Sequence, residues 1–363
     1  MVNLEIVSRN PLLLRPFLRR SRDLSTALNR PLKIRSSVDL FPSCRIKALI
    51  WQPTPAIYPI LYALSWGGSE LQMILKGENL IKQAKGPAVA FQGERGAYSE
   101  IAARHFFGKQ IRLVPCLSFD LVFKSVEGGS AQFGVIPVEN SLAGSIHQNY
   151  DLLVKHSLQI IGEQNVRVVH NLIVNPGVRS RSIRRIFSHP QALMQCQKFT
   201  RRMKSAEIVP TYDTAGSVKK IKEEALLDAA AIASELAAEI YGMEIIRRQI
   251  QDNSVNFTRF LVLSKKRRIP KDANKTSIVF SIKNMPGALF RSLSVFALRD
   301  IDLYKIESRP LLGKPWEYLF YIDFAGSLRQ ENCRNAIAHL SEITTFLKIL
   351  GSYPRDTGLK SNG

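Results

Sequence analysis

The chain has 363 residues, of which 45% are hydrophobic and 22% charged, and this composition is typical of a soluble globular protein with two or three domains. No segment approaches the run of about 20 continuous apolar residues that a membrane-spanning helix needs. The four cysteines are scattered without a CxxC pair and the six histidines show no HExxH spacing, which disfavours both a disulfide framework and a protein-built metal site.

The positive charge is distributed in a way that argues against nucleic acid as the main partner. Of the formal net charge of +21, residues 1–50 contribute +7, from eight Arg and two Lys against three acidic residues. This segment is rich in Arg and lacks a long apolar core, which predicts an organelle transit peptide at 1–50, followed by a poorly structured leader at 51–85. The run KKRRIPKDANK at 265–275 is interpreted as a basic, solvated linker. A nucleic-acid binder remains an alternative on charge alone, although no RNA motif or zinc finger accompanies the charge.

From Gly86 onward, short apolar strands alternate with amphipathic helices. Five such units follow one another: PAVAFQG before ERGAYSEIAARHFF, FGVIPV before LAGSIHQNYDLLV, IRRIF before QALMQCQKF, EIVPTY before AGSVKKIKEEAL, and AAIAS before ELAAEIYG. This alternation predicts an α/β fold whose sheets are mainly parallel.

The pattern also predicts two lobes. Its helical rhythm breaks near Gly162 and Glu163, and the following VRVVHNLIV is interpreted as one long strand. We therefore expect a two-lobed catalytic domain over 86–264, resembling a periplasmic binding protein, with lobes formed by about 86–163 plus 244–264 and by about 165–243. Such proteins place their ligand in the cleft between the lobes.

The C-terminal part has a different rhythm. After the basic linker, the residues at 276–353 read as strand, helix, strand, strand, helix and strand, which predicts a ferredoxin-like βαββαβ unit, followed by a tail at 354–363.

Four strand-to-helix turns carry an unusual density of small polar side chains. These turns are Ala97-Tyr98-Ser99, Glu139-Asn140-Ser141, Ser188-His189-Pro190 and Asp213-Thr214. Helix capping is the simplest explanation, since Ser188 with Gln191 fits a capping box and the Asn, Ser, Asp and Thr residues are common N-caps.

A binding function is the alternative explanation for the same turns. Helix N-termini gathered around one cleft would attract an anion. Gln195 follows Ser188 by seven residues, which would return it to the same helix face, and Arg259 offers a bidentate partner for a carboxylate. The pattern therefore indicates a site that holds a small carboxylate and moves a proton.

In this order, the motifs VAFQGERGAYSE, VIPVENSLAGSIHQNYDLL, FSHPQALMQC, YDTAG and NFTRF closely resemble the prephenate dehydratase and arogenate dehydratase family. The segments PGAL at 286–289 and ESRP at 307–310 resemble the ACT regulatory domain of that family, at 276–353 of this chain. The resemblance covers about 86–353, and the ordered set is far more specific than any one motif.

The resemblance implies a carbon–oxygen lyase of phenylalanine biosynthesis. Family members convert prephenate to phenylpyruvate or arogenate to phenylalanine, with loss of carbon dioxide and water. Aromatisation of the ring drives this reaction, so the enzyme has to supply orientation and a proton rather than a cofactor or metal. The resemblance does not decide between the two substrates, and a non-catalytic two-lobed amino-acid sensor with an ACT domain is the alternative.

The resemblance also implies roles for individual residues. Thr258 would act on the leaving hydroxyl, Arg259 would bind a substrate carboxylate and Phe260 would pack against the ring. Further catalytic or substrate-binding positions implied by the motifs are Ser188, Asn140, Gln195, Ser141, Glu139, Thr214 and Ser99.

Regulation by phenylalanine is a further implication of the ACT resemblance. The effector would bind between ACT domains of neighbouring subunits in a homodimer or homotetramer, with Glu307 and Arg309 supplying charge beside Gly287. The full set of expected contacts is Gly287, Ala288, Leu289, Glu307, Ser308 and Arg309. Together with the leader, the family resemblance predicts an enzyme of the chloroplast stroma.

Overall fold

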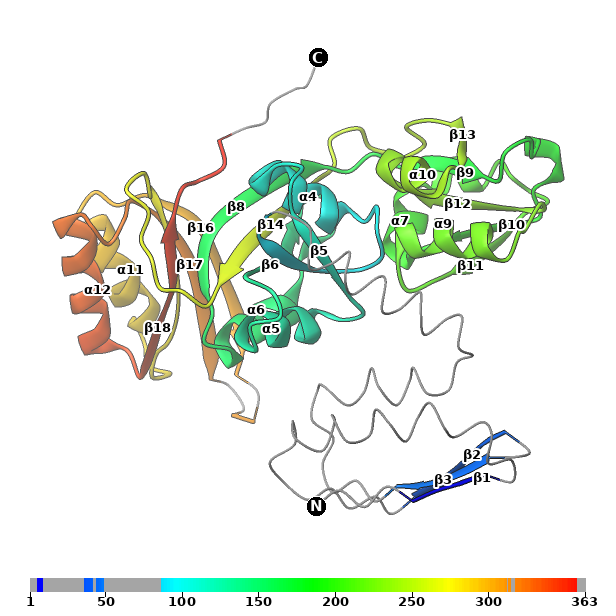
Figure 1. Ribbon diagram of the computed structural model, residues 1–363. Helices are drawn as coiled ribbons and strands as arrows, with labels where there is room; N and C mark the ends of the chain where they lie inside the picture. Colours follow the sequence, from blue (N-terminus) through cyan, green and yellow to red (C-terminus); the bar gives the residue numbers. More distant parts are fainter. Residues whose placement is uncertain are drawn as a thin grey trace. The chain divides into compact units, whose positions relative to one another are not determined.

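The computed structural model describes the strands at 5–8, 36–41 and 44–48, and the residues at 86–311, 313–314 and 317–357 (Figure 1). The chain divides into two compact units, Met1–Ala84 and Lys85–Gly363. In the first unit, an antiparallel sheet has the order β1-β3-β2. Its strands are β1 (Glu5–Ser8), β2 (Ser36–Phe41) and β3 (Cys44–Ala48). The rest of the predicted transit peptide and leader lies outside the described residues.

The second unit contains a six-stranded sheet of order β5-β4-β6-β14-β8, in which the short sixth strand, β7, pairs with β6 outside this order. Continuous apolar runs form its centre, and every residue of β4 except its last is buried. The elements of this part are β4 (Ala88–Gln92), α4 (Tyr98–Phe107), β5 (Arg112–Cys116), α5 (Phe119–Glu127), β6 (Phe133–Asn140), β7 (Gly144–Ser145), α6 (His147–Lys155), β8 (Gln159–Arg167) and β14 (Phe257–Ser264).

A five-stranded sheet of order β11-β10-β12-β9-β13 is formed by the intervening chain. The apolar side chains of β9, β10 and β12 fill its core with those of the covering helices. Its elements are β9 (Asn171–Val174), η2 (Ser180–Ser182), β10 (Arg185–Ser188), α7 (Pro190–Gln195), α8 (Gln197–Thr200), β11 (Glu207–Pro210), α9 (Thr214–Glu223), β12 (Ala229–Ala233), α10 (Glu235–Tyr241) and β13 (Glu244–Arg247).

Both large sheets are mixed, so the prediction of mainly parallel sheets was wrong. β5, β4 and β6 are parallel, but β14 runs antiparallel to both of its neighbours, and β9 runs antiparallel to β12 and β13. The cause is the double crossing of the chain: it leaves the six-stranded sheet through β8 and returns beside β8 in β14. The long strand predicted around Val168 is accordingly two strands, β8 and β9, and Gly162 and Glu163 lie within β8.

The predicted division at residue 244 was also wrong. β13 pairs with β9 and belongs to the five-stranded sheet, so the chain returns to the six-stranded sheet only at β14.

The C-terminal elements form a four-stranded antiparallel sheet of order β16-β17-β15-β18. Their order along the chain is βαββαβ, as the sequence pattern predicts. The elements are β15 (Lys275–Ser281), α11 (Ala288–Ala297), β16 (Leu303–Pro310), β17 (Tyr318–Ala325), α12 (Glu331–Ile343) and β18 (Phe346–Tyr353). Among the described residues, no helix is long and apolar enough to cross a membrane.

The two faces of the four-stranded sheet pack against different partners. On one face, Ile278 and Phe280 share a core with Val295 and Phe296 of α11, and α12 completes this layer (Figure 1). On the other face, residues of β15, β17 and β18 share a core with residues of β8 and α6. The sheet therefore joins the six-stranded sheet through β18 and β8.

Gly351 in β18 lies at this junction and has no room for a side chain. A Cβ atom there would stand 2.2 Å from the carbonyl oxygen of Ile160 in β8, and a backbone atom cannot rotate away. We expect Gly351→Ala to lower the free energy of unfolding by about 1–3 kcal/mol, measured by urea denaturation. Ser341→Ala on the exposed side of α12 is the control, with an expected change within about 0.5 kcal/mol. An equally small change for Gly351→Ala would contradict the close approach of β18 to β8.

Candidate active site

β14 carries Thr258 and Arg259 next to each other, and the geometry of a strand sends their side chains to opposite faces of the six-stranded sheet. In the ladder, Thr258 lies opposite Asn140 of β6 and Val166 of β8. The same alternation applies to β6, where Glu139 faces the Arg259 side and Asn140 the Thr258 side. The two halves of this motif therefore have separate surroundings.

On the Thr258 face, Asn140 is held in one orientation. Its Oδ1 accepts hydrogen bonds from the backbone N–H groups of Leu142 and Ala143 at 3.1 and 3.0 Å. Because a backbone N–H can only donate, Oδ1 and Nδ2 cannot be exchanged. Nδ2 therefore donates to Thr258 Oγ1 at 3.0 Å and to Asn256 Oδ1 at 2.8 Å.

Gln195, at the end of α7, extends this network from the five-stranded sheet. Its Nε2 lies 3.4 Å from Asn140 Oδ1, and its Oε1 accepts from Asn256 Nδ2 at 2.9 Å. His170 approaches the same Oε1 through Nε2 at 2.9 Å. The network therefore joins the segments that carry the two large sheets.

Thr258 itself is left with a proton to donate. Its Oγ1 accepts from Asn140, so the hydroxyl proton is directed elsewhere, and the side chain is 8% exposed. The exposed turn at 141–143 lies beside it, where Ser141 Oγ accepts from the backbone N–H of Phe257 at 3.0 Å. A neutral hydroxyl donor held by amides suits hydrogen bonding to a leaving oxygen.

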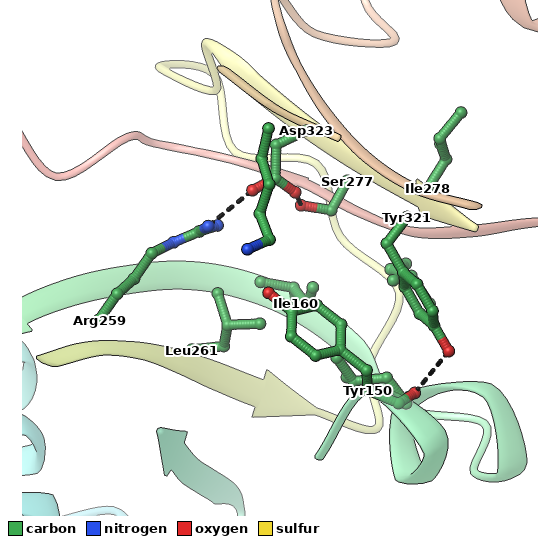
Figure 2. A pocket seen from close by; sticks show the side chains of 11 residues that line it. Tyr150, Ile160, Arg259, Leu261, Ser277, Ile278, Tyr321 and Asp323 are labelled. Carbon is green, nitrogen blue, oxygen red and sulfur yellow. Dashed lines mark hydrogen bonds and ion pairs between the residues drawn. The ribbon is translucent and has the colours of Figure 1, made fainter. Parts of the chain in front are cut away.

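Arg259 on the other face is bound by two buried carboxylates, and Figure 2 shows one of them, that of Asp323. Its Nε donates to Glu163 Oε2 at 2.7 Å, and Asp323 of β17 lies 2.7 Å from its terminal nitrogen. Lys275 joins the same group, 2.9 Å from Glu163, and Tyr353 Oη lies 3.2 Å from the guanidinium.

The charges in this buried cluster stabilise one another. Burial opposes the charge of Arg259, but Asp323, Tyr353 and Glu163 raise its pKa well above the usual value. Burial would likewise raise the pKa of Asp323, but Arg259 and Lys275 hold it below its usual value. We conclude that this ion cluster joins β14 and β8 to the four-stranded sheet.

Comparison with known proteins identifies the family. A family model described as prephenate dehydratase matches residues 89–268. Arogenate dehydratase/prephenate dehydratase 2, chloroplastic, of Arabidopsis thaliana is 50% identical over 281 residues, which cover 74% of this chain and 73% of that protein. Arogenate dehydratase 2 of Petunia hybrida is 45% identical over 298 residues, 77% of this chain and 75% of that protein.

The chain belongs to the prephenate dehydratase family. Among solved structures, the prephenate dehydratase of Arthrobacter aurescens in complex with L-Phe is 32% identical, with a TM-score of 0.68, and covers 74% of this chain and 90% of its own. A structure described as GqqA, a novel type of quorum quenching acylase, is 33% identical with the same TM-score and covers 74% of this chain and 98% of its own.

The structure brings only some of the predicted residues of this prephenate dehydratase family member together. Thr258, Asn140 and Gln195 form one connected network, and Ser141 borders it. Glu139 lies instead on the Arg259 face, 3.2 Å from Lys305 of β16. Phe260 is 2% exposed in the core between the sheets and helices, so its ring does not reach an open surface.

Three other predicted residues have separate roles in the structure. Ser188 is fully buried and donates to the carbonyl oxygen of Ile232 at 2.6 Å. Thr214 begins α9, and Ser99 is buried in the first turn of α4. Within the described part of the chain, none of the three has a hydrogen bond to Thr258, Asn140 or Gln195.

The helix-capping interpretation was right at one turn and wrong at another. Asp213 caps α9 by accepting from Gly216 N at 3.0 Å. The capping box at Ser188 is absent, because His189 is the N-cap of α7 and accepts from Gln191 N. Since Ser188 belongs to β10, the helical spacing between Ser188 and Gln195 does not apply; Gln195 reaches the site through its own contacts.

The predicted effector contacts fall on two different faces of the four-stranded sheet. Gly287, with φ of 76°, directly precedes α11, whose first two residues are Ala288 and Leu289. This helix lies on the helical face of the sheet. The side chain of Glu307 contacts Ser145 and lies 3.3 Å from His147. Arg309 forms a bidentate ion pair with Asp151. Ser308 points to the exposed side of β16. Within this chain, Glu307 and Arg309 therefore face the six-stranded sheet. Their predicted place beside Gly287, at the contact with a neighbouring subunit, stays a prediction.

Sequence reasoning missed Asn256, His170 and Tyr98. Asn256 directly precedes the Phe257-Thr258 pair, and its position in a polar run was the available signal. His170 is 2% exposed inside an apolar stretch, and nothing in the sequence separates it from a core histidine. Tyr98 stood within a predicted turn, but its long-range contact with His170 depends on the fold.

Asp323 tests whether the ion cluster is a structural constraint. Asp323→Asn leaves the buried Arg259 and Lys275 short of negative charge, so we expect the free energy of unfolding to fall by about 3–5 kcal/mol, measured by urea denaturation. The matched control is Glu235→Gln, which breaks the exposed 2.6 Å pair with Arg248 and should cost no more than about 1 kcal/mol. Equal effects of the two substitutions would show that the cluster does not hold the sheets together.

Proposed function

We propose that this chain is a dehydratase of phenylalanine biosynthesis that converts arogenate to phenylalanine, prephenate to phenylpyruvate, or both, by removing carbon dioxide and water. The observation that carries the proposal is the Thr258 hydroxyl, held by Asn140 with its own proton free, in a chain that is 50% identical to an arogenate dehydratase/prephenate dehydratase. Family membership supplies the reaction class, and the hydrogen-bond network supplies a suitable donor.

The chemistry needs one proton at the leaving group. As the ring carboxylate leaves as carbon dioxide, its bonding electrons enter the ring and the C–O bond to the 4-hydroxyl breaks. The departing hydroxide takes up a proton to become water, and the ring becomes aromatic. In this proposal Thr258 donates a hydrogen bond to the departing oxygen, where negative charge develops, and Asn140 with Gln195 holds that hydroxyl in place.

Substrate binding is proposed for the polar groups bordering this network. Ser141 and the backbone N–H groups of the exposed 141–143 turn are the nearest candidates. We propose a substrate contact for three more residues only in a state in which the two large sheets have moved relative to each other. These residues are Ser188, Thr214 and Ser99. Arg259, whose guanidinium already binds Glu163 and Asp323, would bind a substrate carboxylate only if this ion cluster opened.

The domain organisation is part of the same proposal. The six-stranded and five-stranded sheets would form the two lobes of a periplasmic-binding-protein-like catalytic domain, and residues 276–353 would form an ACT regulatory domain. The L-Phe complex of the prephenate dehydratase from Arthrobacter aurescens supports phenylalanine as the effector. Gly287, before α11, remains the proposed effector position, in a homodimer or homotetramer.

A plastid location is proposed on two grounds. Residues 1–50 have the Arg-rich, acid-poor composition of a transit peptide, and the Arabidopsis relative is named chloroplastic.

The direct experiment is a turnover assay of the purified chain with arogenate and prephenate side by side, each with and without phenylalanine. We expect release of carbon dioxide with formation of phenylalanine or phenylpyruvate, and a change in rate when phenylalanine is added. Binding of phenylalanine without turnover of either substrate would favour the non-catalytic sensor. Turnover without any response to phenylalanine in rate or thermal stability would refute only the regulatory part.

Thr258 provides the sharpest test of the mechanism. Thr258→Ala removes the donor, and we expect kcat to fall by about 10²–10³-fold, as for loss of a donor to a developing oxyanion. Thr258→Ser keeps the hydroxyl and should retain most of the activity. The melting temperatures of both variants should match that of the unsubstituted chain. A near-normal kcat for Thr258→Ala would contradict the proposed role of this hydroxyl.

A further inference from the structure

A buried histidine that the proposed mechanism does not use lies at the far end of the Thr258 network. His170 follows β8 in the segment that leads to β9, and both of its ring nitrogens have polar partners. Nε2 lies 2.9 Å from Gln195 Oε1, and Nδ1 lies 3.1 Å from Tyr98 Oη. Tyr98 comes from α4, and its ring meets the imidazole edge-to-face at 82°.

The proton positions in this network follow from a single fixed point. Backbone N–H groups fix Asn140 Oδ1, so Asn140 Nδ2 donates to Asn256 Oδ1. Asn256 must then present Nδ2 to Gln195 Oε1. Since Gln195 Oε1 is an acceptor, the ring nitrogen of His170 that faces it has to carry a proton.

The other ring nitrogen accepts. Burial lowers the pKa of His170, an effect that the Gln195 contact offsets only in part, and this direction favours the neutral ring with one proton. That proton is on Nε2, which leaves Nδ1 to accept from Tyr98. The Tyr98 hydroxyl donates to the carbonyl oxygen of Val169 at 2.6 Å and lies farther, at 3.1 Å, from Nδ1, so the Val169 carbonyl is its main acceptor and the Nδ1 contact is secondary.

We propose that His170, as the neutral Nε2–H tautomer held by Tyr98, is a positioning residue that fixes the Gln195 amide and through it the Asn140–Thr258 pair. The inference rests on the proposed dehydratase function for its catalytic consequence. His170 does not touch Thr258; it acts by keeping Gln195 Oε1 turned away from Asn140 Oδ1. If the Gln195 amide rotated, two oxygens would face each other and the Asn140 contact would be lost.

Two substitutions at position 170 separate positioning from packing. A Gln side chain reaches the place of Nε2 and keeps a donor for Gln195, whereas an Asn side chain reaches only the place of Nδ1 and keeps the Tyr98 contact. We expect His170→Asn to lower kcat by about 10–100-fold with little change in KM, the usual cost of losing an outer hydrogen-bond partner. His170→Gln should retain most of kcat. His339→Asn on α12 is the matched control and should behave as the unsubstituted chain.

A second pair of variants tests the route through Gln195. In a Gln195→Ala background, adding His170→Asn should cause almost no further loss of kcat, because the group that His170 positions is already gone. Multiplicative losses would overturn the proposal. So would equal losses in His170→Asn and His170→Gln that follow their melting temperatures, since that would mean a packing role only.

The tautomer can be measured without any turnover. Nitrogen-15 NMR of the full chain with labelled histidine should show His170 protonated on Nε2 and not on Nδ1 at neutral pH. The opposite tautomer would overturn the inference even if the enzyme is active. An Nε2–H signal in a chain that turns over neither arogenate nor prephenate would instead leave the positioning geometry standing and refute the proposed function.

Discussion

Successive side chains of β14 point to opposite faces of the six-stranded sheet, and this alternation separates a neutral hydrogen-bonded site from a charged cluster by one residue. Thr258 faces Asn140, and Arg259 faces Glu163 and Asp323. An arginine on the Thr258 face would place a permanent charge beside a hydroxyl that acts as a neutral donor. On its actual face, the guanidinium ties the strand that carries Thr258 to the four-stranded sheet.

This arrangement connects the C-terminal four-stranded sheet physically to the site around Thr258. Asp323 belongs to β17 and Lys275 begins β15, so two strands of the four-stranded sheet contact Arg259 of β14 and Glu163 of the neighbouring β8. On the opposite side of the strand, Gln195 brings in α7 of the five-stranded sheet. The backbone of Thr258 is therefore held between contacts to both neighbouring sheets, and a shift of either sheet changes the surroundings of its hydroxyl.

Local patterns in the sequence were sufficient for most elements but not for their long-range pairing. Apolar runs and helical periods predicted the strands and the βαββαβ order. The polar residues Asn140 and Gln195 stood out by their chemistry, and the family resemblance pointed to Thr258. The side of the sheet that Arg259 faces could not be predicted, because both faces of β14 are covered and its apolar residues do not alternate. Lys275 was similarly interpreted as part of a solvated basic linker. In the structure it is buried and pairs with Glu163, which lies 112 positions away in the sequence.

Amide hydrogen exchange along β14 tests the constraint most directly. Exchange is followed by mass spectrometry in the peptide that contains 257–264, with β4 of the same sheet as the internal reference, in the unsubstituted chain and in Asp323→Asn. If the ion cluster holds the strand that carries Thr258, exchange in 257–264 rises in the variant by much more than exchange in β4. Equal changes in β14 and β4, or none in either, would contradict the view that one strand joins the site to the four-stranded sheet.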